Sequence, residues 1–255
     1  MRAKRHDGRI AVVSGASSGI GQAAAARLAE DGCEVFIADL APADETLLSI
    51  RAIGGKATVV HCDVSDPASV AALGKQVEES AGRCDILVNC AGIYPAQTLD
   101  EISFDDWRRV LSVNLDSMFL TTKAFYGGMR QRRWGRIINF ASDTVSLVVP
   151  GFTHYITSKA GIIGLTRALA TELGEHNITV NAIAPGLTRT QGTLARKEMG
   201  GMSNDEFFDL IANMQSIKRP ELVSDLVGAV SFLASDDASF VTGQTLYVNG
   251  GLTRT

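Results

Sequence analysis

The sequence lacks the features typical of secreted, membrane-bound and zinc-binding proteins. Its four cysteines, Cys33, Cys62, Cys84 and Cys90, form no C-x-x-C pair, and no cysteine and histidine cluster has zinc-site spacing. The charged N-terminus has no apolar signal-peptide core, and no apolar run approaches the roughly 18 residues of a membrane-spanning helix. We therefore expect a cytoplasmic protein with reduced, buried cysteines, no metal site and no membrane contact.

Positive charge is also scarce. The formal net charge is -4, and the only dense basic cluster is RQRRWGR at residues 130–136. Nucleic-acid-binding proteins usually concentrate basic residues on one face. A short basic run is more typical of a helix C-terminus, where cations meet the negative end of the helix dipole. We expect no nucleic-acid partner.

Short runs rich in β-branched residues alternate with helical patterns along the 255 residues, of which 45% are apolar. Strands with little polar alternation are typical of a parallel sheet covered by helices on both faces. The sequence predicts a single α/β domain over residues 1–255, with a doubly wound, seven-stranded parallel sheet in three layers. The irregular segment 187–216 is a candidate substrate lid. The expected strands are 9–14, 34–39, 57–62, 85–89, 136–141, 178–184 and 245–248, and the expected helices are 19–31, 43–53, 67–80, 104–131, 155–175 and 221–234.

A glycine-rich turn, SGASSGIG, follows the first predicted strand and opens the first predicted helix. Gly15, Gly19 and Gly21 carry no side chains, so backbone N–H groups can approach a pyrophosphate at the helix N-terminus. The second strand ends at Asp39, where a dinucleotide-binding (Rossmann) fold places an acid against the adenosine ribose hydroxyls. A carboxylate there repels a 2′-phosphate, and Leu40 follows in place of a cation. These features favour NAD over NADP.

Tyr155 and Lys159 are four positions apart in a predicted helix, so both project from one face. A free phenol has a pKa of about 10. A cation about 4 Å away, at an effective dielectric of about 20, stabilises the phenolate by about 4 kcal/mol. The pair could therefore work as an acid/base couple near neutral pH, although this spacing also occurs by chance in surface helices.

The accompanying motifs decide between these interpretations. SGASSGIG, CDV (62–64), NCAG (89–92), VNL around Asn114, Ser142 at a strand end, YITSK (155–159) and APG (184–186) occur in this order. Together they resemble the short-chain dehydrogenase/reductase family over nearly the whole chain, from Arg9 to Gly251. The resemblance implies a Rossmann fold and oxidation of an alcohol by a nicotinamide cofactor.

The resemblance also implies a role for each matched residue. Tyr155 would be the general acid/base, Lys159 would lower its pKa and hold the nicotinamide ribose, and Ser142 would bond the reacting oxygen. Asn114 would hold a water that links Lys159 to solvent. The expected NAD-binding residues, beyond Tyr155 and Lys159, are Gly15, Ser17, Ser18, Gly19, Ile20, Gly21, Asp39, Leu40, Asp63, Val64, Asn89, Ala91, Gly92, Pro185, Gly186, Thr188 and Thr190.

Two residues depart from this pattern or compete with it. Cys90 replaces an asparagine of the family's usual N-N-A-G, and a thiol cannot reproduce the hydrogen bonds of an amide. We expect this change to affect local stability more than chemistry. His154 adjoins Tyr155, but one helical step turns a side chain by about 100°, so we interpret it as a bystander to proton transfer.

The substrate is less clearly indicated. Apolar residues among the candidates for the substrate pocket favour an apolar or aromatic secondary alcohol or ketone as the substrate. Segments such as GIYP and THYI are similar to those of NAD-dependent 1-phenylethanol-type dehydrogenases. A pyridoxal 4-dehydrogenase-like enzyme, a 3-oxoacyl-(acyl-carrier-protein) reductase and a non-catalytic dinucleotide-binding module are the alternatives. The family resemblance implies a homotetramer, and the lid could equally pack on itself or on a neighbouring subunit. The pocket candidates are 93–95, 143–149 and the lid residues Met199, Met202, Phe207, Phe208 and Met214.

Overall fold

A parallel sheet of seven strands organises the computed structural model, which describes residues 4–195 and 201–254. The strand order is β3-β2-β1-β4-β5-β6-β9, so the winding direction reverses between β1 and β4. Ligands of such sheets bind beyond the carboxyl ends of the strands at this reversal. The predicted doubly wound fold is confirmed. The strands are β1 (Ile10–Ser14), β2 (Glu34–Asp39), β3 (Lys56–His61), β4 (Ile86–Asn89), β5 (Gly135–Phe140), β6 (Ile178–Pro185) and β9 (Thr245–Val248).

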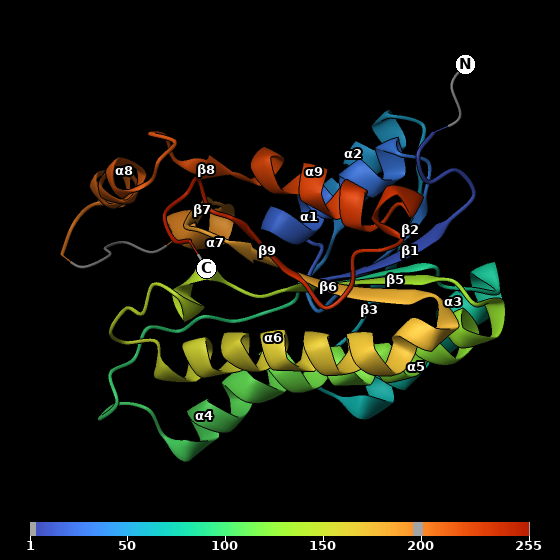
Figure 1. The fold of residues 1–255 in the computed structure, drawn as a ribbon, viewed down its shortest axis with the longest axis horizontal. Coiled ribbons are helices and arrows are strands. Elements are labelled where there is room, and N and C mark those ends of the chain that lie inside the picture. Colours follow the sequence, from blue (N-terminus) through green and yellow to red (C-terminus); the bar gives the residue numbers. More distant parts are fainter. Residues whose placement is uncertain (1–3, 196–200, 255) are drawn as a thin grey trace.

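Helices cover both faces of the sheet (Figure 1). On one face lie α1 (Gly19–Glu30), α2 (Asp44–Ala52) and α9 (Val223–Leu233). On the other lie α3 (Pro67–Ala81), α4 (Phe104–Leu111), α5 (Ser117–Arg132) and α6 (Thr153–Leu173). None of the helices in the described part of the chain is both long and apolar enough to span a bilayer.

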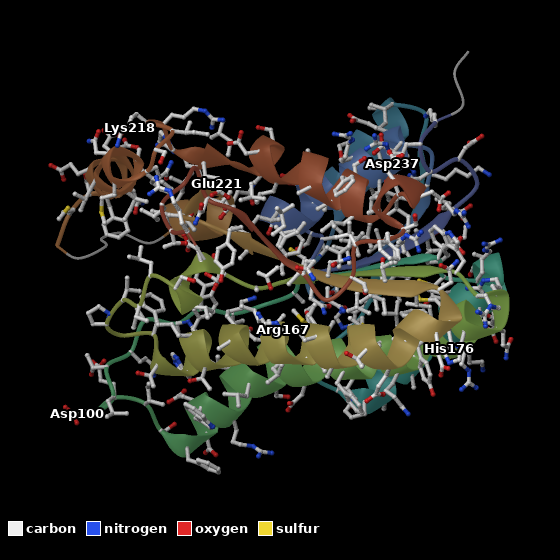
Figure 2. All side chains as sticks on the ribbon, viewed as in Figure 1. Asp100, Arg167, His176, Lys218, Glu221 and Asp237 are labelled. Atoms are coloured by element: carbon white, nitrogen blue, oxygen red, sulfur yellow. The ribbon has the colours of Figure 1, made fainter. Side chains whose placement is uncertain are left out.

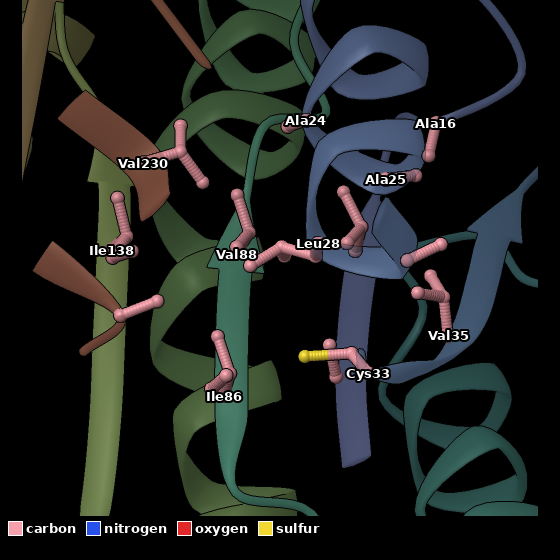
Figure 3. Packing of buried hydrophobic residues seen from close by; sticks show 14 of the residues in the cluster. Ala16, Ala24, Ala25, Leu28, Cys33, Val35, Ile86, Val88, Ile138 and Val230 are labelled. Carbon is pink, nitrogen blue, oxygen red and sulfur yellow. The ribbon is translucent and has the colours of Figure 1, made fainter. Parts of the chain in front are cut away.

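The core lies between the sheet and these helices. β1, β4 and β5 are buried along their whole length, as expected for strands with helices on both sides. Figure 3 shows how Leu28 of α1 and Val88 of β4 point toward one another across this layer. The short alanines of α1, among them Ala24 and Ala25, let the helix lie close to the strands.

The long helix predicted at 104–131 is interrupted. Between α4 and α5, residues Ser112–Asp116 form a π-helical turn, in which the Ser117 N–H donates to the Ser112 carbonyl five residues back. The Val113 carbonyl accepts a 2.6 Å bond from Ser117 Oγ. Such turns occur often at functional sites. This one places Asn114 in the interior, where it is fully buried.

The predicted lid and the last predicted helix also contain small elements that the pattern did not reveal. In the lid, β7 (Thr188–Arg189) pairs in parallel with β8 (Glu221–Leu222), which occupies the start of the last predicted helix. That helix therefore begins at Val223 and not at 221. The lid contains α7 (Gln191–Leu194) and α8 (Asn204–Met214). Met199 lies outside the described residues.

The basic run at 130–136 is split between two environments. Arg130 and Arg132 lie in the last turn of α5, as predicted. Arg136, in contrast, is buried in β5, where its guanidinium donates to the Ser235 carbonyl and to Asp236. A buried, paired arginine is part of the structure and presents no basic surface.

A buried polar chain crosses the sheet just below its carboxyl edge. Asn89 Nδ2 donates to Asn139 Oδ1 at 2.9 Å, and Thr121 Oγ1 donates to Asn89 Oδ1 at 2.8 Å. Asn139 Nδ2 in turn donates to Thr166 Oγ1 at 3.0 Å. The chain links α5, β4, β5 and α6. Tyr155 lies in α6, Asn114 lies in the π-helical turn directly before α5, and Ser142 follows β5 by two residues. Fully satisfied networks of this kind specify a unique arrangement.

We expect Asn139→Ala to lower the free energy of unfolding by about 2–4 kcal/mol, because it leaves Asn89 Nδ2 and Thr166 Oγ1 buried without their partner. Urea unfolding measures this change. The exposed Asn213→Ala is the control and should stay within about 0.5 kcal/mol of the parent chain. Equal effects at the two positions would contradict a structural role for the polar chain.

Candidate active site

The glycine-rich turn is packed so tightly that only glycine fits. A Cβ on Gly21 would lie 2.1 Å from the Gly15 carbonyl oxygen, and one on Gly15 would lie 2.6 Å from Ala91 Cα. Gly15 and Gly19 also have positive φ values of 67° and 58°. The turn therefore presents bare backbone at the N-terminus of α1, which is the geometry that receives a pyrophosphate. These residues fit a dinucleotide.

Asp39 ends β2 beside this turn. Its Oδ2 accepts the Ser17 N–H at 2.9 Å, and its Oδ1 accepts the Ala41 N–H at 3.0 Å. Each carboxylate oxygen can accept a further bond, so the group can also receive ribose hydroxyls. The Leu40 side chain is 57% exposed and supplies no cation for a 2′-phosphate. The residues here suit an unphosphorylated ribose.

Lys159 is a buried cation in α6. Its Nζ donates to the Phe140 carbonyl at 2.7 Å and lies 5.6 Å from the centroid of the Tyr155 ring. Burial lowers the pKa of Lys159 to about 8. Burial also raises the pKa of the nearby Cys90 thiol to about 12, so this thiol is neutral at physiological pH. Within residues 4–195 and 201–254 the ammonium forms no salt bridge, so its charge lies near the Tyr155 ring without a carboxylate partner.

Ser142 follows β5 and caps a single turn at Asp143–Val145. Its Oγ accepts hydrogen bonds from the Thr144 N–H at 3.2 Å and from Thr144 Oγ1 at 2.9 Å. Because both of these bonds use the Ser142 oxygen as acceptor, the Ser142 O–H is left to act as a donor. This polarity suits a residue that steadies the oxygen of an alcohol or ketone.

Asn114 lies next to the lysine. Its side chain exchanges two hydrogen bonds with the backbone of Ile93, at 2.8 and 2.9 Å, and donates to Ser158 Oγ at 3.0 Å. Asn114 Oδ1 and Lys159 Nζ both converge on Gly92, where a Cβ would lie 3.3 and 3.7 Å from them. The π-helical turn thus brings the Asn114 amide and the Lys159 ammonium to the same glycine, and the role of Asn114 in a proton relay stays a prediction.

Two aromatic rings flank Tyr155. Tyr94 and Phe152 each make an edge contact with its ring, at centroid distances of 6.3 and 6.1 Å. Tyr94 also approaches the lid, since a Cβ on Gly192 would lie 2.2 Å from Tyr94 Oη. The apolar segment 93–95 therefore contributes to the wall of the site. Of the lid candidates, Phe208 is buried below Arg189, while Met202 and Met214 are largely exposed.

The remaining predicted cofactor residues lie along the same edge. Thr190 caps α7 and reaches over the turn, since a Cβ on Gly19 would lie 3.5 Å from Thr190 Cβ. Asp63 accepts hydrogen bonds from the backbone and hydroxyl of Ser65, and Val64 is buried beside it. The Asn89 side-chain amide is engaged in the buried polar chain, so its backbone is the part that remains for contact with a cofactor.

Cys90 fits without the missing amide. The Cys90 side chain packs against the apolar cluster between β1 and α1. The N–H groups of Cys90 and Ala91 donate to Ser14 Oγ at 3.2 and 3.3 Å. The β4 turn is therefore braced by the serine at the end of β1. The cost to local stability that we expect from Cys90 stays a prediction.

Two buried carboxyl groups, Glu221 and Asp143, lie near the predicted nicotinamide-binding residues. Glu221 was not among the candidates predicted from the sequence, and Asp143 was included only within the pocket segment 143–149. Glu221, which is labelled in Figure 2, accepts hydrogen bonds from the Gly186 N–H and from Thr188 Oγ1, each at 2.9 Å. Burial raises its pKa to about 7, and the charge of Asp143 adds to the shift. Burial likewise raises the pKa of Asp143 to about 6. The pattern showed Glu221 only as the first residue of a helix.

Fold and site together define a nicotinamide dinucleotide oxidoreductase. Residues 15–253 match the family model described as enoyl-(acyl carrier protein) reductase. The chain belongs to the short-chain dehydrogenase/reductase family.

Individual relatives extend along nearly the whole chain. It is 40% identical to (2S)-((R)-hydroxy(phenyl)methyl)succinyl-CoA dehydrogenase subunit BbsD of Thauera aromatica, covering 95% of this chain and 96% of the relative. It is 36% identical to the 3-oxoacyl-(acyl-carrier-protein) reductase FabG of Haemophilus influenzae, covering 96% and 98%. The crystal structure of a levodione reductase superposes with a TM-score of 0.92 at 29% identity, covering 97% of this chain and 98% of that chain.

The raised pKa of Glu221 predicts a pH-dependent stability. The folded chain keeps this proton up to about pH 7, whereas an ordinary glutamate with a pKa of 4.5 loses it earlier. The free energy of unfolding therefore falls as the pH rises from about 4.5 to about 7. Glu221→Gln removes this dependence, and we expect it to stabilise the chain by about 1–3 kcal/mol at about pH 8 and by little at about pH 5.

Urea unfolding of both proteins at the two pH values measures this difference. The exposed Glu78→Gln is the control and should give no pH-dependent difference. A Glu221→Gln chain that is less stable than the parent at the higher pH would overturn the assignment.

Proposed function

We propose that the protein is an NAD(H)-dependent oxidoreductase that interconverts a secondary alcohol and a ketone, with an apolar or aromatic substrate. The observation that supports this proposal is that three side chains predicted to be catalytic come from elements that meet at one edge of the sheet. Tyr155 and Lys159 lie on one helix face, and Ser142 follows the strand whose Phe140 carbonyl holds the lysine. Asn114 completes the group from the π-helical turn.

Oxidation of the alcohol removes a proton from its hydroxyl and a hydride from its carbinol carbon. Tyr155, as phenolate, accepts the hydroxyl proton, and the Ser142 O–H donates to the same oxygen. The Lys159 ammonium stabilises the Tyr155 phenolate. Asn114 holds a water through which Lys159 exchanges protons with solvent. NAD, held by the glycine turn, Asp39 and Lys159, supplies the hydride acceptor when bound. Reduction of a ketone runs the same steps in reverse.

The preference for NAD rests on Asp39. A carboxylate fixed by the Ser17 and Ala41 amides cannot turn away from a 2′-phosphate without losing both hydrogen bonds. A 2′-phosphate on that ribose would bring a second negative charge to this carboxylate, and like charges repel in a partly buried site. The neutral Leu40 offers no compensation.

The aromatic substrate class rests on the rings of Tyr94 and Phe152 beside Tyr155. Aromatic walls favour aromatic ligands through edge and offset contacts. The name of the Thauera relative describes a hydroxyl on a carbon that carries a phenyl group, which is an aromatic secondary alcohol. A 1-phenylethanol-type substrate fits both observations.

A 3-oxoacyl thioester is the second candidate, because the Haemophilus relative is named for that reductase activity. The acidic Glu172 and Glu175 near the end of α6 oppose docking of an acidic carrier protein. We further propose a cytoplasmic homotetramer. The exposed Phe119 of α5 lies beside a hollow of about 450 Å³ that Leu115 and, from α6, Leu165 also line, and this supports an interface on the face formed by α5 and α6.

We expect Tyr155→Phe to lower kcat for 1-phenylethanol oxidation by at least about 10³-fold, because the ring remains and the proton acceptor is lost. The Kd for NADH, read from its fluorescence, should change by less than about twofold. Ketone reduction at the parent rate by this variant would disprove the central role of Tyr155.

Replacing both residues at the end of β2, as Asp39→Ala with Leu40→Arg, should move the preference toward NADP. The ratio of kcat/KM for NAD to that for NADP should fall by at least about 100-fold, because a repelling charge is exchanged for a pairing one. Asp44→Ala with Leu48→Arg, at exposed positions on α2, is the control and should leave the ratio unchanged. An unchanged ratio in the first variant would refute the role of Asp39.

A further inference from the structure

The first turn of α6 carries Tyr155 but has no ordinary cap. The helix begins at Thr153, and the preceding residue, Phe152, makes no side-chain hydrogen bond to the helix. The first N–H groups of a helix have no partner within the helix, so a side chain or solvent must satisfy them. Tyr155 is the third residue of α6, and its N–H is one of these groups.

The His154 side chain supplies the partner. The Tyr155 N–H donates to His154 Nδ1 at 2.9 Å, and the imidazole is fully buried. On the opposite side of the ring, His154 Nε2 lies 3.0 Å from Gln97 Oε1. A nitrogen that accepts a hydrogen bond carries no proton, so the Nδ1 contact fixes the tautomer with hydrogen on Nε2, which then donates to Gln97.

The surroundings favour this neutral form. Burial lowers the pKa of His154, and the attraction of the nearby Asp106 carboxylate only partly offsets that effect. The Gln97 N–H donates to the Gly151 carbonyl at 2.9 Å, which ties the segment before α6 to the segment that follows Gly92. That second segment also carries Tyr94, whose ring touches Tyr155.

From these contacts we propose that His154 is a positioning residue for Tyr155. Its Nδ1 holds the backbone amide of Tyr155, and its Nε2–H holds the loop of Gln97 and Tyr94 against the same ring. The sequence-based interpretation of His154 as a bystander to proton transfer is kept, because its ring is directed at the backbone. His154 nevertheless affects Tyr155, because loss of the Nδ1 bond frees the first turn of α6 to shift Tyr155 relative to Ser142 and Lys159. This inference rests on the proposed function of Tyr155.

Two substitutions separate the two bonds. An asparagine side chain places its Oδ1 near the position of Nδ1, whereas a glutamine amide reaches the position of Nε2. The test compares His154→Ala, His154→Asn and His154→Gln with the parent enzyme. The readouts are kcat and KM for 1-phenylethanol, the Kd for NADH, and hydrogen exchange of the Tyr155 amide.

We expect His154→Ala to lower kcat by roughly 10-fold to 100-fold, because a small displacement of a catalytic group has effects of this size. The NADH Kd should stay within about twofold. His154→Asn should recover most of the kcat and the slow exchange of the Tyr155 amide, and His154→Gln should recover neither. His176→Ala, at the far end of α6 in Figure 2, is the control and should leave every readout unchanged.

The proposal is overturned if His154→Ala keeps the parent kcat, or if asparagine and glutamine restore kcat equally, since either result would reduce His154 to packing. It is also overturned if the Tyr155 amide exchanges at the parent rate in His154→Ala. Failure of the proposed function would look different. The parent enzyme would then not turn over the alcohol, while the exchange of the Tyr155 amide would still report the His154 bond.

Discussion

The arrangement of the site depends on one buried ammonium group, Lys159 Nζ. Burying a charge without compensation is costly, and here a main-chain carbonyl, that of Phe140, accepts its hydrogen bond in place of a carboxylate. The pKa of Lys159 is accordingly lowered to about 8. A carboxylate partner would hold the cation more firmly, but it would also neutralise the charge directed at Tyr155. In the proposed mechanism this charge acts on the tyrosine, and the surrounding elements have to accommodate it.

That accommodation explains features that lie apart in the sequence. The end of β5 must reach the lysine with a carbonyl and then turn at once, which places Ser142 at the site. The π-helical turn brings Asn114 beside Lys159, and Gly161 lets α6 lie close to this turn, since a Cβ there would be 2.7 Å from Leu115. The buried chain from Thr121 to Thr166 joins the same helices and strands. Stability and catalytic geometry therefore depend on the same contacts.

Much of this could be predicted from the sequence, because the relevant signals are local. The β-branched runs, the glycine turn and Asp39 each follow from backbone sterics and charge within a few residues, and the strands indeed lie within a residue or so of their predicted bounds. The π-helical turn was not predicted, because the residue pattern indicated one continuous helix over 104–131. Glu221 was missed, and Asp143 was included only within the pocket segment 143–149, because a carboxyl group becomes unusual only once burial is known. The same holds for His154, whose partner Gln97 is distant in the chain.

The most direct test of the account is the initial rate of NADH formation by the purified protein with a panel of secondary alcohols that includes 1-phenylethanol. The account predicts turnover of aromatic secondary alcohols with NAD, and a kcat/KM for NAD at least about 100-fold above that for NADP. Absence of turnover with every alcohol of the panel would contradict it. A strong preference for NADPH with an acetoacetyl thioester would contradict it equally.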